Sequence, residues 1–408
     1  MRKTVHIIGS GIGGSTLACT LDPKKYKVVM FDRMEKVIEA SYGVAVGVAM
    51  FDILSNELEL DLSDIFRASG TFTRPLHKEF EMKPRKGKKL TLRNMQRVQL
   101  LKKLHTKAKT AHGDNVINSS HSFISCKILP SSGKIESTFI NTKKNKIVTT
   151  VADLIVGADG RTSKVRNYVS LEKNQINFGN IEAFRLTVEE PSKELFELLK
   201  DHTTFSIGRG SHSPAYFMNY HSGGINFIVL HYKQHPTPEN LWGRSVEKQE
   251  IVDMARRTGM TWTANVLEKE TSCSNMKAFD TYHVDAIPWQ NSHDQGNIAI
   301  IGDAAHGYGP LTGRMCNLAI NDAFTLGTCL NNSCNIETNR YDVKSALGKF
   351  EEIQRPKFNM VRAQTYRHLE KYMPNNTEEF LNSFLKEGGP MEGMQELGKI
   401  MGYRISKL

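Results

Sequence analysis

The opening of the chain, a strand followed by a glycine-rich turn, a helix and a second strand, constrains its fold more than any other feature. An apolar run over 5–8 leads into Gly-Ser-Gly-Ile-Gly-Gly at 9–14, after which apolar residues recur at helical spacing. A second apolar run over 26–31 ends in Asp32 and Arg33. Elements in this order begin a doubly wound parallel sheet. We therefore predict an α/β fold that starts with a Rossmann-like domain.

The glycine turn is typical of a dinucleotide site because a strand precedes it and a helix follows it. Glycines let the backbone approach a pyrophosphate at the helix N-terminus, where free N–H groups favour anions. The carboxylate of Asp32 can accept hydrogen bonds from an adenosine ribose and would repel a 2′-phosphate. A structural turn that binds nothing is the alternative. The residues expected at such a site are Gly9, Gly11, Ile12, Gly13, Gly14, Asp32 and Arg33.

Two further motifs place an acidic residue directly after an apolar strand. In the first, a strand leads into Gly157-Ala158-Asp159-Gly160, and Ser163 can cap the helix that carries Arg166. In the second, an apolar strand over 297–301 ends in Gly302-Asp303, and the N-terminus of the following helix points at whatever lies beyond. The carboxylate of Asp303 is well placed to bind a sugar hydroxyl. Either motif alone could be an ordinary strand–turn–helix junction.

In order, these motifs resemble those of the single-component FAD-dependent monooxygenases, the aromatic-hydroxylase family with the p-hydroxybenzoate hydroxylase fold. Arg97-Val98-Gln99-Leu100 is similar to the family's Arg-x-x-Leu helix, whose arginine contacts the flavin side chain. The resemblance spans nearly the whole chain. It implies further cofactor contacts from Arg97, Asp159, Gly160, Gly302, Asp303, Pro310, Gly313, Met315 and Asn317.

The resemblance also implies the chemistry. FAD would be the cofactor, NADPH or NADH the electron donor, and a small aromatic molecule the substrate, hydroxylated with O2 through a flavin C4a-hydroperoxide. The cofactor carries this chemistry, so we name no catalytic side chain, and we interpret His306 as local structure rather than as a base. Two alternatives stay open. One is a peroxisomal flavin oxidase or reductase without hydroxylation, and the other is a non-catalytic protein on this scaffold.

One position departs from the family pattern. The family has Pro-x-x-Gly-x-Gly-x-Asn beside the flavin ring, whereas this sequence has Pro310, Gly313, Met315 and Asn317 at the corresponding positions. Glycine there lets the backbone approach the pyrimidine edge of the flavin. Methionine could shift the flavin or weaken its retention. The interpretation we favour is a tolerated substitution around which the loop has rearranged.

The pattern of the rest of the chain predicts a divided FAD-binding domain. A helix is expected over about 92–105, strands over 116–126 and 147–156, and a kink or joint at Pro356. Strand-like alternation in the insert places Arg185 and Tyr216 on the sheet that would cover the substrate. The predicted parts are FAD-binding segments 1–70, 92–180 and 284–340, a hairpin 71–91 that joins the substrate domain, a β-rich substrate domain 181–283, and C-terminal helices with a tail 341–408.

The charge of the chain does not indicate a nucleic-acid partner. Lys and Arg number 54 against 43 Asp and Glu, a formal charge of +11, but the basic residues are scattered. The one dense block, 83–89, contains Pro and Gly and is typical of a hairpin tip. No apolar run approaches the roughly 18 residues of a membrane span. We therefore expect neither nucleic acid nor a membrane segment.

Cysteine usage and the C-terminus bear on metal content and location. The 6 cysteines form no CxxC pair and no cluster with zinc spacing, so we expect a reduced compartment and no metal. The chain ends in Ser406-Lys407-Leu408, the address that the peroxisomal import receptor reads. We expect a peroxisomal protein if the source is eukaryotic. In a bacterial source the tripeptide would mean nothing, and a cytoplasmic protein is expected.

Overall fold

The computed structural model describes most of the chain, with gaps. The described residues are 2–36, 42–70, 91–170, 176–199, 204–207, 214–219, 224–233, 235–237, 243–284, 287–291, 297–307, 315–338 and 340–371. The predicted hairpin 71–91, apart from residue 91, the basic block 83–89 and the tail beyond 371 lie outside these residues.

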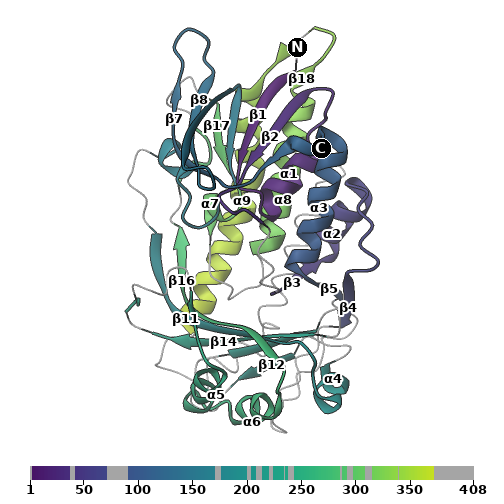
Figure 1. Ribbon diagram of the computed structural model, residues 1–408, viewed down its shortest axis with the longest axis vertical. Helices are drawn as coiled ribbons and strands as arrows, with labels where there is room; N and C mark the ends of the chain where they lie inside the picture. Colours follow the sequence, from purple (N-terminus) through teal and green to yellow (C-terminus); the bar gives the residue numbers. More distant parts are fainter. Residues whose placement is uncertain are drawn as a thin grey trace.

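A five-stranded parallel sheet forms the centre of the upper half of the molecule (Figure 1). Its order is β17 (Ile298–Ile300), β10 (Leu154–Gly157), β1 (Lys3–Ile8), β2 (Tyr26–Phe31) and β6 (Ile117–Asn118). The inner strands are buried on both faces, so they read as continuous apolar runs. This sheet confirms the α/β class predicted from the opening of the chain.

Three helices pack together on one side of this sheet. They are α1 (Ile12–Thr20), α3 (Arg97–His112) and α8 (Met315–Asn332). The antiparallel strands β7 (His121–Ile128), β8 (Ile135–Asn141) and β9 (Lys146–Ala152) form a separate sheet that covers its other side. Phe139 of β8 stacks on Phe31 of β2 with ring centroids 4.1 Å apart, which joins the two sheets in one core.

A six-stranded antiparallel sheet forms the lower layer (Figure 1). Its order is β12 (Thr204–Ile207), β13 (Pro214–Asn219), β14 (Ile225–Tyr232), β11 (Ile176–Val188), β16 (Cys273–Val284) and β15 (Arg244–Ser245). Helices α5 (Lys248–Arg257) and α6 (Thr261–Lys269) cover the face that points away from the parallel sheet, and α4 (Lys193–Leu199) lies beside them. The opposite face is turned toward the parallel-sheet domain.

Smaller elements complete the chain. Strands β3 (Gly43–Gly47), β5 (Thr91–Gln96) and β4 (Phe66–Gly70) form a three-stranded sheet, and α2 (Val48–Asp52) with the π-helical turn η1 (Ile53–Glu57) follows β3. Short 3₁₀ turns lie at η2 (Asp114–Val116) and η3 (Val165–Tyr168), and α7 (Asp303–His306) follows β17. A two-stranded pair, β18 (Cys334–Asn335) and β19 (Arg340–Tyr341), precedes α9 (Val343–Lys371), which runs toward the lower sheet.

Several predicted boundaries were wrong for one reason, long-range pairing. The helix expected from about 92 begins at Arg97, because residues 91–96 pair with both β3 and β4 as β5. The strand expected over 147–156 is two strands, since β9 pairs with β8 and β10 pairs with β1. The strand expected over 116–126 is likewise split into β6 and β7.

Two expected helical features also differ. The helix expected after Ser163 is only the 3₁₀ turn η3. Pro356 is not a joint between two helices, because it lies inside α9, which continues through it.

Candidate functional site

The carboxyl ends of the parallel strands bring the three sequence motifs to one edge of the sheet. The glycine turn follows β1, Asp32 follows β2, Asp159 follows β10, and Asp303 follows β17. Ligands of open α/β sheets bind at this edge. The motifs are also in contact, because the backbone N–H of Ala158 donates to Ile8 O at 2.7 Å.

The glycine turn is built so tightly that two of its positions exclude a side chain. Gly9 has φ +103°, and a Cβ there would lie 2.3 Å from Ala158 O. A Cβ on Gly14 would lie 2.0 Å from Gly9 O. The turn ends at Gly11, the N-cap of α1, which supplies no side-chain cap, and Ile12 and Gly13 begin the helix. The first turn of α1 therefore keeps N–H groups for an anion.

The carboxylate of Asp32 holds this turn closed. Its Oδ2 accepts hydrogen bonds from Ser10 N at 2.7 Å and Ser10 Oγ at 2.8 Å, and its Oδ1 accepts one from Met34 N at 2.9 Å. Oδ2 has both of its lone pairs engaged by Ser10, whereas Oδ1 accepts one bond and keeps a further lone pair for a ribose hydroxyl. Arg33, the next residue, is exposed.

Arg97 places a guanidinium beside the glycine turn. Its Nη2 lies 3.8 Å from the position that a Cβ on Gly11 would occupy, and its Cζ lies 5.5 Å from the ring centroid of Tyr42. The backbone N–H of Arg97 donates to Tyr42 O at 3.0 Å, which ties the start of α3 to β3. In the described part of the chain no carboxylate forms an ion pair with this guanidinium. Arg97 and the α1 N-terminus together make a site for a phosphate group.

Asp159 is engaged within its own turn. Its carboxylate accepts hydrogen bonds from Ser163 Oγ at 2.5 Å, Lys164 N at 2.8 Å and Val165 N at 3.3 Å. Burial raises the pKa of Asp159, and these bonds oppose the rise. Its described contacts therefore shape the turn, whereas Gly160 beside it, at φ +80°, leaves open space on the turn's surface.

Ser163 acts at the start of η3 as the sequence analysis expected, since its Oγ accepts a hydrogen bond from Arg166 N at 3.1 Å. Arg166 joins the second motif to the third. It is only 1% exposed, and its Nε donates to Ala304 O at 2.7 Å while its Nη2 donates to Asp303 O at 3.0 Å. The sequence analysis placed Arg166 on a helix but did not foresee this bridge. An arginine near a turn carries no local signal of its distant partner.

Asp303 offers an open carboxyl group at the start of α7. Among the described residues, none donates a hydrogen bond to this carboxyl. Burial raises the pKa of Asp303, opposed by His306 and by the arginines 161, 97 and 166. A carboxyl that is partly covered, surrounded by cations and free of protein donors is suited to hydroxyl groups of a bound molecule.

The start of α8 lies near the same groups. Burial raises the pKa of Cys316 to about 12, while the nearby Arg97 lowers it and Asp303 raises it further. Asn317 fastens this end of α8 to β3, because its Oδ1 accepts from Gly47 N at 2.8 Å and its Nδ2 donates to Ala45 O at 2.9 Å. Pro310 and Gly313 lie outside the described residues.

Met315, the residue that departs from the family pattern, begins α8. Its side chain is partly buried and packs against both hydrophobic cores of the upper half. The methionine therefore fills space inside the protein. This packing favours the interpretation of a tolerated substitution.

A second group of side chains faces the site from the lower sheet. The guanidinium of Arg185 lies 4.5 Å from the ring centroid of Tyr42 and 5.5 Å from that of Phe279. Strand register aligns Arg185 with Ile228 and Ile228 with Tyr216, so the backbones of the two predicted substrate residues lie in one row across the sheet. The side chain of Tyr216 lies outside the described part of the structure.

The sequence analysis missed Tyr42, Phe279 and Arg161 as site residues. Arg161 lies with its Cζ 5.7 Å from the ring centroid of Tyr282, and burial lowers its pKa, opposed by Asp303, Tyr282 and Tyr42. Tyr42 and Phe279 belong to no motif, and Arg161 lies inside the second motif but was not named as a site residue. Only the fold brings the cations and rings together.

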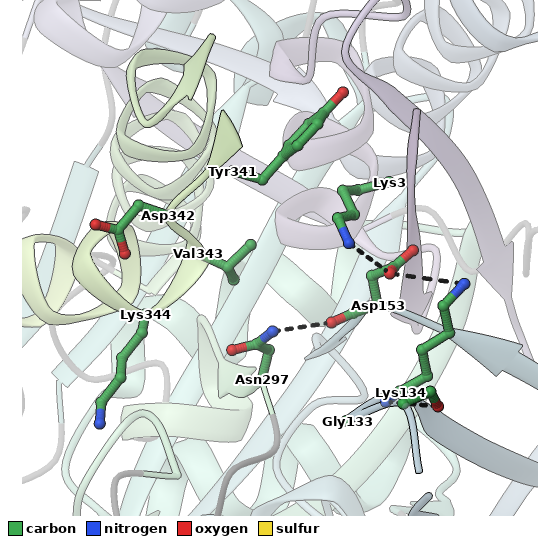
Figure 2. Close-up of a pocket in the computed structure, with 10 residues that line it drawn as sticks. Lys3, Gly133, Lys134, Asp153, Asn297, Tyr341, Asp342, Val343 and Lys344 are labelled. Atoms are coloured by element: carbon green, nitrogen blue, oxygen red, sulfur yellow. Dashed lines mark hydrogen bonds and ion pairs between the residues drawn. The ribbon is translucent and has the colours of Figure 1, made fainter. Parts of the chain in front are cut away.

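A hollow of about 240 Å³ at the other end of the parallel sheet is a different place (Figure 2). Lys3 and Lys134 there share one oxygen of Asp153, at 3.1 and 3.8 Å, and Asn297 Nδ2 donates to Asp153 O. It lies at the amino ends of β1 and β10, away from the motifs. In the residues that the structure describes, no helix is long and apolar enough to cross a membrane.

Comparisons with known proteins identify relatives of this chain. The family described as "FAD binding domain" matches residues 2–338. The 3-amino-4-hydroxybenzoate 2-monooxygenase PtmB3 of Streptomyces platensis is 25% identical over 231 residues, which is 56% of this chain and 54% of that protein. Hispidin-3-hydroxylase of Neonothopanus nambi is 22% identical over 272 residues, 62% of this chain and 59% of that protein.

Among solved structures, Klebsiella pneumoniae HpxO complexed with FAD and uric acid has a TM-score of 0.72 at 15% identity, covering 99% of this chain and 97% of that chain. At this identity the likeness shows the fold. The chain spans somewhat more than half the length of the two curated relatives it matches.

Proposed function

This chain belongs to the FAD-binding domain family of FAD-dependent monooxygenases, and on that premise we propose that it uses FAD, NADPH or NADH, and O2 to hydroxylate a small aromatic substrate. The observation that carries the proposal is the convergence of Arg97 and Asp303 at the carboxyl edge of the sheet, opposite Arg185. The side that carries Arg97 and Asp303 suits a dinucleotide, and the side that carries Arg185 suits an aromatic acid.

The residues present fit FAD. The phosphates would lie at the N-terminus of α1 beside the guanidinium of Arg97, where the absence of a side chain at Gly11 leaves space next to Arg97 Nη2. Asp32 would bind the adenosine ribose, and the open carboxyl of Asp303 would bind hydroxyls of the flavin side chain. FAD, when bound, supplies the redox chemistry between the nicotinamide, O2 and the substrate.

The side chains of the chain itself orient the substrate and shape the electrostatic field. Arg185, stacked between Tyr42 and Phe279, would bind an acidic group of the substrate. On the same sheet Ile181, Ala183 and Leu230 form a buried apolar cluster that would help to keep water from the reacting atoms. Arg97 and Arg161 would stabilise negative charge that develops on the bound cofactor.

Two relatives support an aromatic acid or a similar planar anion. One is a 3-amino-4-hydroxybenzoate 2-monooxygenase, and the other is a structure that contains uric acid. Arginines 97, 161 and 185 all lie near Tyr42, and Asp303 is a carboxylate beside Arg161 in the described part of the site. A net positive site of this kind selects anionic ligands.

The test is reconstitution of the purified protein with FAD, followed by measurement of NADPH and NADH consumption against a panel of aromatic acids that includes 3-amino-4-hydroxybenzoate and uric acid. The expected result is substrate-stimulated consumption and a product heavier by one oxygen atom. Hydrogen peroxide without that product, for every compound, would favour the flavin oxidase or reductase. A protein that bound no FAD would contradict the proposal as a whole.

Location is a separate proposal that rests on the sequence of the tail. We propose that Ser406-Lys407-Leu408 directs the protein to the peroxisome through the import receptor. These residues lie outside the described part of the chain, so the support is the tripeptide alone.

A further inference from the structure

Helix α8 touches both glycine turns of the proposed flavin site through one small residue. A Cβ on Gly302 would lie 3.2 Å from Ala319 Cβ, and a Cβ on Gly13 would lie 3.6 Å from the same atom. Asp322 lies on the same face of α8, nearly one turn further along. The helix therefore packs at once against the phosphate turn and against the turn that carries Asp303.

Asp322 is a buried carboxylate, 1% exposed, with three N–H donors around it. Its Oδ2 accepts hydrogen bonds from Gly302 N at 2.9 Å and from His306 Nε2 at 2.5 Å. Its Oδ1 accepts one from Gln354 Nε2 of α9 at 3.3 Å. Hydrogen bonds to a charged acceptor in a poorly solvated place are among the stronger ones in proteins.

His306 takes part as a donor through Nε2. Its ring is stacked 4.9 Å from Phe358 and lies 5.2 Å from Trp289, and its Nδ1 has no hydrogen-bond partner in the described structure. A proton on Nδ1 would be a buried donor without an acceptor, which is more costly than an unused lone pair. The geometry therefore makes Nε2 the nitrogen that donates to Asp322.

These bonds determine where Asp303 lies. Gly302 adopts φ +61° and is the N-cap of α7, so its orientation sets the direction of Asp303, the next residue. Asp322 holds the N–H of Gly302 on one side, and Arg166 holds the carbonyls of Asp303 and Ala304 on the other. With its backbone held twice, Asp303 keeps its carboxyl free of donors from the described residues.

We propose that Asp322 is a positioning residue for FAD: it does not touch the cofactor, and it sets FAD affinity by fixing Gly302 and hence the carboxyl group of Asp303. The inference rests on the proposed flavin site. It adds that α8 and, through Gln354, α9 contribute to cofactor affinity from outside the binding surface.

The experiment is a double-mutant cycle on the FAD dissociation constant, measured by flavin fluorescence titration of apoprotein. Asp322→Asn removes the charge and weakens the hold on Gly302 and His306, so we expect FAD to bind at least about tenfold more weakly. In the Asp303→Ala background the same substitution should weaken binding by less than about twofold further, because residues that act through one group are not additive. A role confined to overall stability would instead give additive effects.

Asp153→Asn is the matched control. Asp153 is also a buried aspartate whose Oδ2 accepts a backbone hydrogen bond, from Thr4 N at 2.8 Å, but it lies at the opposite end of the same sheet. We expect this variant to lower the thermal midpoint of the apoprotein and to leave the FAD dissociation constant within twofold.

Each result has one meaning. A wild type that binds no FAD contradicts the proposed function. A wild type that binds FAD, with Asp322→Asn within twofold of it or additive with Asp303→Ala, overturns the positioning role. If Asp322→Asn does not fold, Gln354→Met removes the donor that α9 supplies to Asp322, together with its hydrogen bond to Asn321 Oδ1. We then expect about threefold weaker binding in the wild-type background and no change in the Asp303→Ala background, and additivity would again overturn the inference.

Discussion

The guanidinium of Arg185 lies 4.5 Å from the ring centroid of Tyr42, although the two residues belong to different layers of the molecule. Tyr42 precedes β3 of the upper half, and Arg185 is on β11 of the lower sheet. Arg97 lies near the same ring, so one tyrosine connects the proposed flavin arginine with the proposed substrate arginine. The contact between Arg185 and Tyr42 therefore joins the two layers at the proposed site.

Replacing Arg185 should affect the substrate and not the cofactor. Because the guanidinium stacks on Tyr42 and Phe279, lysine cannot restore its plane or its forked hydrogen bonding. We expect Arg185→Ala and Arg185→Lys both to raise KM at least tenfold for the aromatic acid found in the NADPH-consumption screen, as expected for loss of a charge-assisted bond. The FAD dissociation constant should stay within twofold. An unchanged KM in both variants would place Arg185 outside the substrate site.

Replacing Arg97 should have the opposite effect and weaken the binding of the cofactor. Its guanidinium lies beside the glycine turn and has no carboxylate partner in the described structure. We expect Arg97→Ala to weaken FAD binding at least about tenfold, by loss of a charge-assisted hydrogen bond to a phosphate. Raising the salt concentration should bring the FAD dissociation constants of the wild type and this variant closer together, since salt screens the attraction between Arg97 and the phosphate. Equal affinities at low salt would refute the assignment.

Met315→Gly separates the two interpretations of the departure from the family pattern. The methionine side chain packs against two hydrophobic cores, so its removal should lower the free energy of unfolding by about 2 kcal/mol. We expect the FAD dissociation constant of this variant to be no tighter than that of the wild type. Urea unfolding of the apoprotein and FAD titration in one buffer provide the measurements. A tenfold tightening would mean that Met315 compromises the flavin site.

His6 predicts a pH dependence of stability. Burial lowers the pKa of His6 to about 4 from 6.5, with Lys27 contributing. The native state therefore binds fewer protons than the unfolded state between those values, so stability falls as pH drops from 6.5 toward 4. The loss is roughly 3 kcal/mol at most, from 1.36 kcal/mol per unit.

The matched variant for this pH dependence is His6→Asn, which keeps a polar atom near Ser137 Oγ, 3.4 Å from His6 Nδ1. Denaturant midpoints at pH 7 and pH 5 should differ less in the variant than in the wild type. Parallel pH profiles for the two proteins would show that His6 contributes nothing to this dependence.

The peroxisomal address is tested by deletion. A fluorescent protein fused to the N-terminus leaves Ser406-Lys407-Leu408 at the free end, and we expect the fusion to enter peroxisomes of a eukaryotic host cell. Removal of the last three residues should leave it in the cytosol. The same distribution before and after the deletion would exclude the tripeptide as the signal.

The parallel sheet, its glycine turn and the acids that follow its strands could be predicted from the sequence because their causes are local. A glycine is needed at position 14 because a Cβ there would meet Gly9 O in the same turn, and an aspartate after a buried strand has to lie at the edge of the sheet. Those patterns also carried the resemblance that the family match confirmed.

Tertiary structure alone decided which distant strands pair and which distant side chains and backbone groups come into contact. Residues 91–96 became a strand because β3 and β4 lie on either side, although their pattern suggested a helix. Arg166 reaches Ala304, Asp322 reaches Gly302, and Arg185 reaches Tyr42 only once separate layers have packed. A side chain's type and spacing show which bonds it can form. Which distant group it meets depends on long-range packing, which no local pattern records.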